Sequence, residues 1–182
     1  DFNDMVLQGV RRLHDQGARH IAMMTWDGKL IPVFQKALGE LGLAFRDRWV
    51  RCDLPPALPG SGWEEFRELW TAYSEKPDGL LVCDDMLLRE ALPAILQLHL
   101  HIPRDLRIVA HANVGSGIFA PFPMTVAEAD PARVANQMGD ILLQLIRGEP
   151  VPQAHILLPV SWKDGVTSPT GPRGTVPVTS GV

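Results

Sequence analysis

The sequence predicts an α/β fold built on a doubly wound, mostly parallel sheet. Short, uniformly apolar runs alternate along the chain with longer segments whose apolar residues recur at helical spacing. Runs that are apolar throughout are typical of strands buried on both faces, as in parallel sheets. Right-handed crossovers through the intervening helices then produce a doubly wound layer. With 182 residues, 46% of them hydrophobic, the chain can build such a core without disulfides.

The predicted elements follow one another in strict order, and local signals mark their ends. We expect helices at 2–13, 30–41, 61–73, 86–98 and 131–147, and strands at 21–24, 49–52, 80–83, 106–111, 124–126 and 156–160. Asp130 followed by Pro131 is typical of a helix N-terminus. Ser61 and Glu64 have the spacing of a capping box, in which each side chain bonds the other's backbone N–H.

Charge and composition exclude several classes of protein. The formal net charge is −4 with no basic block, which is unfavourable for nucleic-acid binding by these residues alone. No apolar run is long enough to span a bilayer. The two cysteines, Cys52 and Cys83, are predicted to be buried free thiols. Residues 169–182 are rich in Pro and Gly and are predicted to be a flexible tail. The chain begins at Asp1 rather than Met, so the absence of an N-terminal module proves nothing.

Polar side chains follow the predicted strands at their carboxyl ends, where open α/β sheets bind ligands. The candidate ligand-binding residues are Trp26, Asp27, Asp53, Asp84, His111 and Asn113. Carboxylates accept hydrogen bonds from hydroxyl groups, and an indole face packs on apolar sugar surfaces. The pattern therefore indicates a polyhydroxylated ligand, with a cationic ligand as the alternative.

Each of these residues also has a purely structural interpretation. Asp27, Asp53 and Asp84 could be helix caps or turn residues, because strand-to-helix loops commonly end in one. Trp26 could cover the core, and His111 could be a buried histidine whose hydrogen bonds are satisfied inside the protein.

Signatures of catalysis are thin, and we predict no enzyme, no catalytic residue and no cofactor. The chain contains no nucleophile elbow, phosphate-binding loop or dinucleotide fingerprint. His99 and His101 have no third ligand nearby, so no metal site is predicted. Asp84 and Asp85 could bind Mg²⁺ in a metal-dependent hydrolase. That remains the weakest alternative, because no nucleophile-and-base pair accompanies them.

Four landmarks, taken in order, resemble a known family. They are Cys83-Asp84-Asp85 before a helix, IPRDLRIV at 102–109, Thr125-Val126 before a short linker and helix, and LLPV at 157–160. In this order and spacing, over residues 1 to 168, the chain resembles the effector-binding core of lactose- and galactose-repressor-type transcription regulators.

The resemblance implies the type I periplasmic-binding-protein fold, in which crossovers join two Rossmann-like lobes. Residues 18–126 and 161–168 would form the C-terminal, effector-binding lobe, and residues 1–17 and 127–160 would be elements of an incomplete N-terminal lobe. The implied function is that of a small-molecule effector-binding and dimerisation domain of a cytoplasmic regulator. DNA would be bound only through a headpiece that this chain lacks, and no membrane partner is expected. The alternative is the solute-binding protein of an ABC importer, which shares the fold.

The resemblance carries over to the site only in part. Asp84 matches the position where the family places an effector-contacting Asn or Asp. Leu30 stands where the family has an anchoring Arg, and Ala112 stands where it has an Asp that chelates sugar hydroxyls, with Asn113 adjacent. Two alternatives stay open: an effector other than a sugar, or a pocket that no longer functions.

The family also dimerises partly through this lobe. The corresponding surface is the helix after the Asp pair together with the apolar loop after the fourth strand. The predicted homodimer-interface residues are Met86, Leu87, Glu90, Ile118 and Phe119. The alternative for each is packing on the chain's own sheet.

Overall fold

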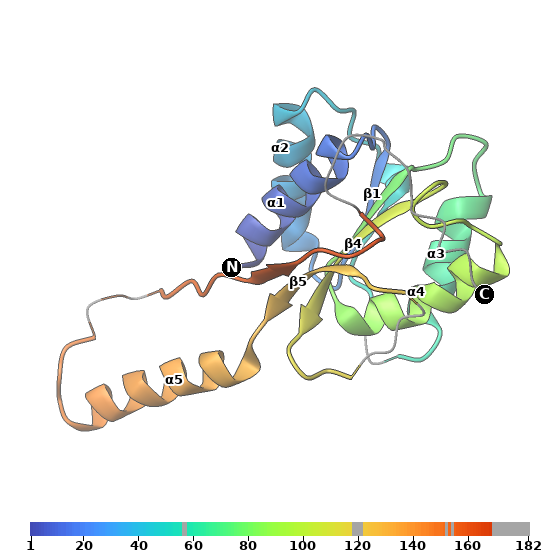
Figure 1. The fold of residues 1–182 in the computed structure, drawn as a ribbon. Coiled ribbons are helices and arrows are strands. Elements are labelled where there is room, and N and C mark those ends of the chain that lie inside the picture. Colours follow the sequence, from blue (N-terminus) through green and yellow to red (C-terminus); the bar gives the residue numbers. More distant parts are fainter. Residues whose placement is uncertain (56–57, 118–121, 152, 154, 169–182) are drawn as a thin grey trace, which may run out of the picture.

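The computed structural model describes residues 1–55, 58–117, 122–151, 153 and 155–168. Its centre is a six-stranded sheet with the order β2-β1-β3-β4-β5-β6 (Figure 1). The strands are β1 (Ile21–Met24), β2 (Val50–Arg51), β3 (Gly79–Val82), β4 (Arg107–Asn113), β5 (Thr125–Ala129) and β6 (Ser161–Lys163). All neighbours pair in parallel except β6, which runs antiparallel to β5. The predicted fold class, a mostly parallel α/β sheet, is confirmed.

Two pairs of helices cover the two faces of the sheet (Figure 1). The helices α1 (Phe2–Asp15) and α2 (Ile31–Glu40) share one apolar core with the sheet, and α3 (Ser61–Thr71) and α4 (Asp85–Gln97) share the other. Alternate residues of β3 serve the two cores: Leu81 faces α1, and Leu80 faces α4. Both are fully buried, which is why the strand is apolar throughout.

Helix α1 approaches the sheet closely because residue 9 is glycine. A Cβ at Gly9 would lie 2.8 Å from Cδ1 of Leu81 in β3, nearer than real Cβ contacts allow. Residues 1–17 are predicted to belong to the other lobe, yet α1 packs on the sheet of β3 and β4 and its apolar face lies in their core. How residues 1–17 and 127–160 divide between two lobes stays a prediction.

Helix α5 (Pro131–Ile146) is the exception to this packing. It begins as predicted, with the Asp130 side chain accepting hydrogen bonds from the N–H groups of Ala132 and Arg133. The helix projects away from the sheet (Figure 1), and none of its residues is buried. Met138 is 66% exposed and Ile146 is 72% exposed. Its apolar face is therefore uncovered.

After α5 the chain returns to the sheet and is fixed there. Strand β6 pairs with β5, and beyond it Thr167 and Ser168 are fully buried. The Thr167 hydroxyl donates to the carbonyl of Ile108 in β4 and accepts from the N–H of Thr125 in β5. Residues 161–168 thus close the sheet on its β5 side.

Two local predictions are wrong. Residues 156–160 form no strand, because the ladder with β5 begins only at Ser161 and a strand needs a hydrogen-bonded neighbour. The capping box at Ser61 and Glu64 is also absent. Residue Gly60 is the N-cap, and the Ser61 hydroxyl instead donates to the carbonyls of Pro55 and Leu58.

Two further observations concern the whole described chain. Cys52 and Cys83 are free, as predicted, but only Cys83 is buried, because Cys52 lies in the loop after β2. Among the described residues, no helix has the length and apolar character needed to cross a membrane.

Candidate functional site

The predicted ligand-binding residues gather at the carboxyl edge of the parallel sheet, as strand direction requires. Trp26 and Asp27 follow β1, Asp53 follows β2, and Asp84 follows β3. The fourth strand runs two residues further than predicted and ends at Asn113. His111 therefore lies within the strand, two residues before its end. The edge therefore joins an aromatic group, three carboxylates, an imidazole and an amide.

Asp84 is the N-cap of α4, which confirms the structural interpretation of this residue. Its Oδ1 atom accepts hydrogen bonds from the N–H groups of Met86 at 2.9 Å and Leu87 at 3.1 Å. The Oδ2 atom accepts none from the described residues. Burial raises the pKa of Asp84, the Leu87 N–H opposes that shift, and the charge of Asp85 adds to it. This second oxygen therefore has unused hydrogen-bonding capacity.

Asp85 is a second anchor of this edge, although it is not among the predicted ligand-binding residues. It is only 4% exposed, and its Oδ2 atom accepts from the backbone N–H of Asn113 at 3.0 Å and from the Asn113 amide at 3.2 Å. The pair ties the start of α4 to the end of β4. The adjacency of two aspartates at a strand end was the available signal, but their separate roles depend on the helix geometry.

His111 is buried, but its hydrogen bonds are not satisfied. The residue is 3% exposed, and neither ring nitrogen has a partner among the described residues. Burial lowers the pKa of His111, while the charges of Asp85 and Asp84 oppose that shift. The ring lies 5.1 Å from the ring of Phe2, in the first turn of α1. The interpretation as a satisfied core histidine is therefore wrong, because the ring lies against Phe2 and no group of the described chain forms a hydrogen bond with its nitrogens.

Two exposed aromatic rings lie at this edge. Trp26 is 43% exposed and does not cover the core, and its ring meets Phe2 edge-to-face at 6.3 Å. Phe2 lies in the first turn of α1, and nothing in the sequence around it signals a place at this site. Together the rings offer an apolar surface at this edge, on which a flat ligand can pack.

Asp27 and Asp53 act as turn residues, as their structural interpretation predicted. Asp27 accepts from the N–H of Lys29 at 2.9 Å, and Asp53 accepts from the N–H of Gly28 at 3.3 Å. They fix the loop after β1 against the loop after β2. Leu30 is 5% exposed, so no polar group is available at the position of the family's anchoring Arg.

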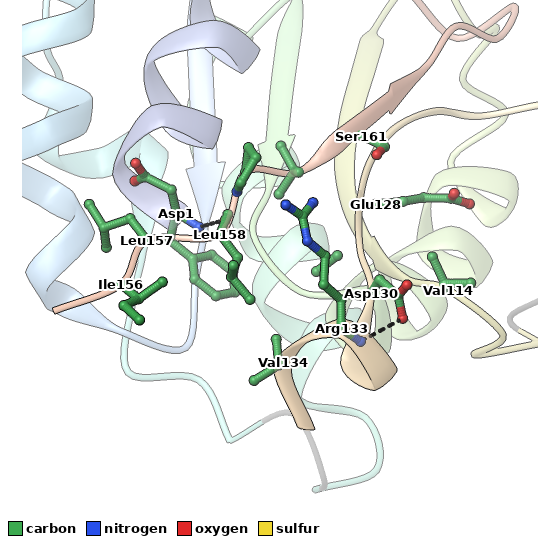
Figure 2. Close-up of a pocket in the computed structure, with 14 residues that line it drawn as sticks. Asp1, Val114, Glu128, Asp130, Arg133, Val134, Ile156, Leu157, Leu158 and Ser161 are labelled. Atoms are coloured by element: carbon green, nitrogen blue, oxygen red, sulfur yellow. Dashed lines mark hydrogen bonds between the residues drawn. The ribbon is translucent and has the colours of Figure 1, made fainter. Parts of the chain in front are cut away.

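Two cavities lie toward the β5 side of this edge. One of about 360 Å³ is lined by Asp85, Ala112, Asn113 and Glu128. Its apolar lining includes Met124, just before β5, and Val126 in β5. The other, of about 370 Å³, lies between the start of α1, the end of β5 and residues 156–161 (Figure 2). The Arg133 side chain extends into this space from α5 (Figure 2). Of the six predicted ligand-binding residues, only Asn113 lines either cavity.

The predicted dimer-interface residues have different positions. Leu87 is fully buried against the sheet, so its side chain belongs to the core and cannot reach a partner. Met86 is partly exposed. Glu90 accepts from the N–H of Gly60 at 2.9 Å, and this bond and Arg89 lower the pKa of Glu90. Ile118 and Phe119 lie outside the described residues.

Comparison with known proteins identifies the class. The sequence model of the periplasmic binding protein-like domain family matches residues 10–168 of this chain. The chain therefore belongs to this family.

Within that class, the relatives are transcription regulators. A segment of 114 residues is 30% identical to the HTH-type transcriptional repressor PurR of Haemophilus influenzae (strain PittEE), and it covers 62% of this chain and 33% of that protein. The chain thus spans about a third of the length of this curated relative. The resemblance to the effector-binding core of lactose- and galactose-repressor-type regulators is confirmed.

Solved structures agree on the fold. The transcription regulator CcpA of Lactococcus lactis matches with a TM-score of 0.79 at 18% identity, over 93% of this chain and 63% of that chain. A complex of the transcriptional regulator CelR with cellobiose matches with a TM-score of 0.80 at 20% identity, over 92% of this chain and 52% of that chain.

Proposed function

We propose that this chain is the small-molecule effector-binding and dimerisation domain of a LacI-type transcription regulator. The observation that carries the proposal is the unpaired oxygen of Asp84 on the same sheet edge as the exposed rings of Phe2 and Trp26, where parallel sheets bind ligands. Membership of the periplasmic binding protein-like family supports it.

The other parts of the proposal follow from the class of the relatives. PurR is a transcriptional repressor, so we assign the chain no catalytic activity and no cofactor. DNA would be bound by a helix-turn-helix headpiece outside these residues, in a cytoplasmic homodimer without a membrane partner. Met86 on α4 remains a candidate for the dimer interface because part of it is exposed.

The effector would be a polar metabolite with an apolar face. CelR is known in complex with cellobiose, and a sugar is one candidate here. However, Ala112 and Leu30 supply no polar side-chain atoms. A ligand with hydrogen-bond donors for Asp84 and a flat face for Trp26 and Phe2 satisfies the groups that are present.

A thermal-shift screen tests the proposal. The panel comprises mono- and disaccharides including cellobiose, nucleobases, and polyamines. We expect one class to raise the melting temperature of the chain, because a ligand that binds only the folded state stabilises it. Trp26→Ala should raise the dissociation constant of that ligand at least about tenfold, since it removes the exposed ring, and the shift in melting temperature at a given ligand concentration should become smaller. Tyr73→Ala is the matched control, an exposed aromatic residue away from this edge that should leave the shift intact.

Two outcomes would overturn the proposal: no compound shifts the melting temperature, or Trp26→Ala and Tyr73→Ala behave alike. The coding sequence upstream of Asp1 separates the regulator from the importer protein. A helix-turn-helix there is the expected result, and a secretory signal would instead establish the solute-binding alternative. Magnesium-dependent hydrolysis of a model phosphate ester would support the hydrolase, and we expect none.

A further inference from the structure

The opposite edge of the sheet carries a cluster of basic and aromatic side chains. His20 immediately precedes β1 and Trp49 immediately precedes β2, so both lie at the amino ends of strands, away from the candidate effector site. The ring of His20 lies 5.1 Å from that of Trp49. The guanidinium groups of Arg46 and Arg48 lie over the Trp49 ring, at 5.0 Å and 5.5 Å from its centroid.

This cluster has more hydrogen-bond donors than acceptors. Arg46 and Arg48 bind the same carboxylate, that of Glu75, each through its Nη2 atom. The Nε atoms of both arginines and the Nε1 atom of Trp49 are buried without any acceptor. They make up three of the six such side-chain atoms in the described part of the chain. Buried donors are almost always paired in native proteins, so these unpaired atoms show that the single carboxylate of Glu75 does not satisfy the two arginines.

The arginines are held in place and remain accessible at their tips. Arg48 also lies over the Tyr73 ring, at 5.2 Å, so both guanidinium planes are fixed by aromatic neighbours. Their side chains are still 36% and 32% exposed. Part of each arginine side chain can therefore be reached from solution, although its Nε atom cannot.

The charges around the cluster favour an anion. Lys76 adds a third cation close by, with its ammonium group on the carbonyls of Trp70 and Tyr73. Glu75 is the only carboxylate that pairs with the two arginines among the described residues. Asp47 lies between them in sequence but is exposed and forms no ion pair in the described structure.

We propose that Arg46 and Arg48, supported by Trp49, form a binding site for a phosphate group. A guanidinium group binds carboxylate and phosphate through the same paired N–H donors, but a phosphate group has more acceptor oxygens and can accept from both arginines at once. The phosphate could be free or attached as a monoester to a protein side chain. The site is separate from the candidate effector site and does not depend on the proposed function.

Titration with inorganic phosphate, followed by NMR at the indole N–H of Trp49, tests this proposal. The unpaired indole proton lies within the cluster, so we expect its resonance to shift and saturate with phosphate. Chloride at the same ionic strength should not reproduce the shift. A Trp49→Phe variant assigns the resonance. Absence of a saturable shift beyond that of chloride overturns the proposal.

Charge-matched variants show which arginines are responsible. Arg46→Gln/Arg48→Gln should weaken phosphate binding at least about tenfold. Arg11→Gln/Arg147→Gln removes the same charge from exposed positions on α1 and α5 and should leave binding unchanged. Equal losses in the two double variants would show general charge attraction and overturn the site.

Two further arms complete the test. Arg48→Lys keeps the charge but not the planar fork, and it covers the case in which the double variant does not fold. It should still fold and bind phosphate more weakly than the parent, and unchanged binding contradicts the proposed geometry. A short peptide containing one phosphoserine distinguishes the sources: tighter binding than inorganic phosphate indicates an attached phosphate, and equal or weaker binding indicates the free ion.

Discussion

Helices α1 and α5 are similar in sequence pattern and opposite in environment. Each begins with an aspartate whose side chain caps the first turn, and they contain 14 and 16 residues. Five residues of α1 are buried, including Met5, Val6, Val10 and Leu13 at 0% exposure. In α5 no residue is buried.

The difference shows that amphipathicity specifies a helix and its apolar face, but not what covers that face. Gly9 lets α1 lie directly on β3, whereas α5 has no sheet against it in the described chain. Stability in such a molecule should therefore be uneven. Changes in the sheet core should affect global unfolding, and changes in α5 should affect only that helix.

The largest expected effect is that of Leu13→Ala in α1. The side chain is fully buried, so its removal leaves a cavity in the core. We expect the free energy of unfolding to fall by about 2–5 kcal/mol. Urea denaturation followed by tryptophan fluorescence measures the change. A loss under about 1 kcal/mol would mean that α1 is not part of the cooperative core.

Asp85→Ala tests whether the carboxyl edge belongs to the same core. The substitution leaves the backbone N–H and the amide of Asn113 without their acceptor, so we expect a loss of about 1–3 kcal/mol in the free energy of unfolding. Asn113→Ala is the matched variant. It retains the backbone hydrogen bond to Asp85 and should cost less. The reverse order would contradict the role assigned to Asp85.

The two helix caps give a direct comparison. Asp84→Ala should lower the free energy of unfolding by about 1 kcal/mol, because α4 is packed on the sheet. Asp130→Ala removes an equivalent cap from α5 and should reduce helical content, measured by circular dichroism, with little change in the main unfolding transition. Equal effects on that transition would show that α5 unfolds together with the sheet.

The pH dependence of stability tests the buried position of His111. Its pKa is lowered in the folded state, so the unfolded chain binds more protons between that value and about 6.5. The stability contributed by neutral His111 is therefore present above about pH 6.5 and is lost as the pH falls below it. We expect His111→Phe to lose less stability between about pH 6.5 and pH 5. An NMR titration midpoint at or above about 6.5 for His111 would contradict this account.

The smallest expected effect is that of Leu142→Ala in α5. The side chain is 57% exposed, so its removal should change the free energy of unfolding by less than about 0.5 kcal/mol. The measurement parallels that of Leu13→Ala. A cost above about 1 kcal/mol would show that the apolar face of α5 is covered in solution.

The core of the fold was predictable because its signals are local and redundant. The strand at 80–83 lies at Gly79–Val82, and the helix at 86–98 lies at Asp85–Gln97, since buried runs and amphipathic stripes have clear boundaries. The strand at 156–160 was wrong because an apolar run does not show whether a neighbouring strand exists to pair with it.

The site was predictable only as a location. The topology brought Trp26, Asp84 and His111 to one edge, as strand direction requires. The roles within it depend on contacts between distant residues. Asp85 accepts a hydrogen bond from Asn113, which lies 28 residues further along the chain. The ring of Phe2, in the first helix, packs against that of His111 in the fourth strand. Nothing in the local sequence of Phe2 or Asp85 signals these contacts.

The antiparallel pairing of β5 with β6 has a consequence for the engineering of this chain. Residue Glu128 faces Ser161 across the ladder, so the chain leaves and re-enters the sheet at adjacent points. The segment between these two residues is therefore an insertion between the paired strands β5 and β6. A short hairpin turn in place of residues 131–160 would preserve the strand order and the buried contacts of Thr167, and it would yield a minimal sheet unit for binding measurements.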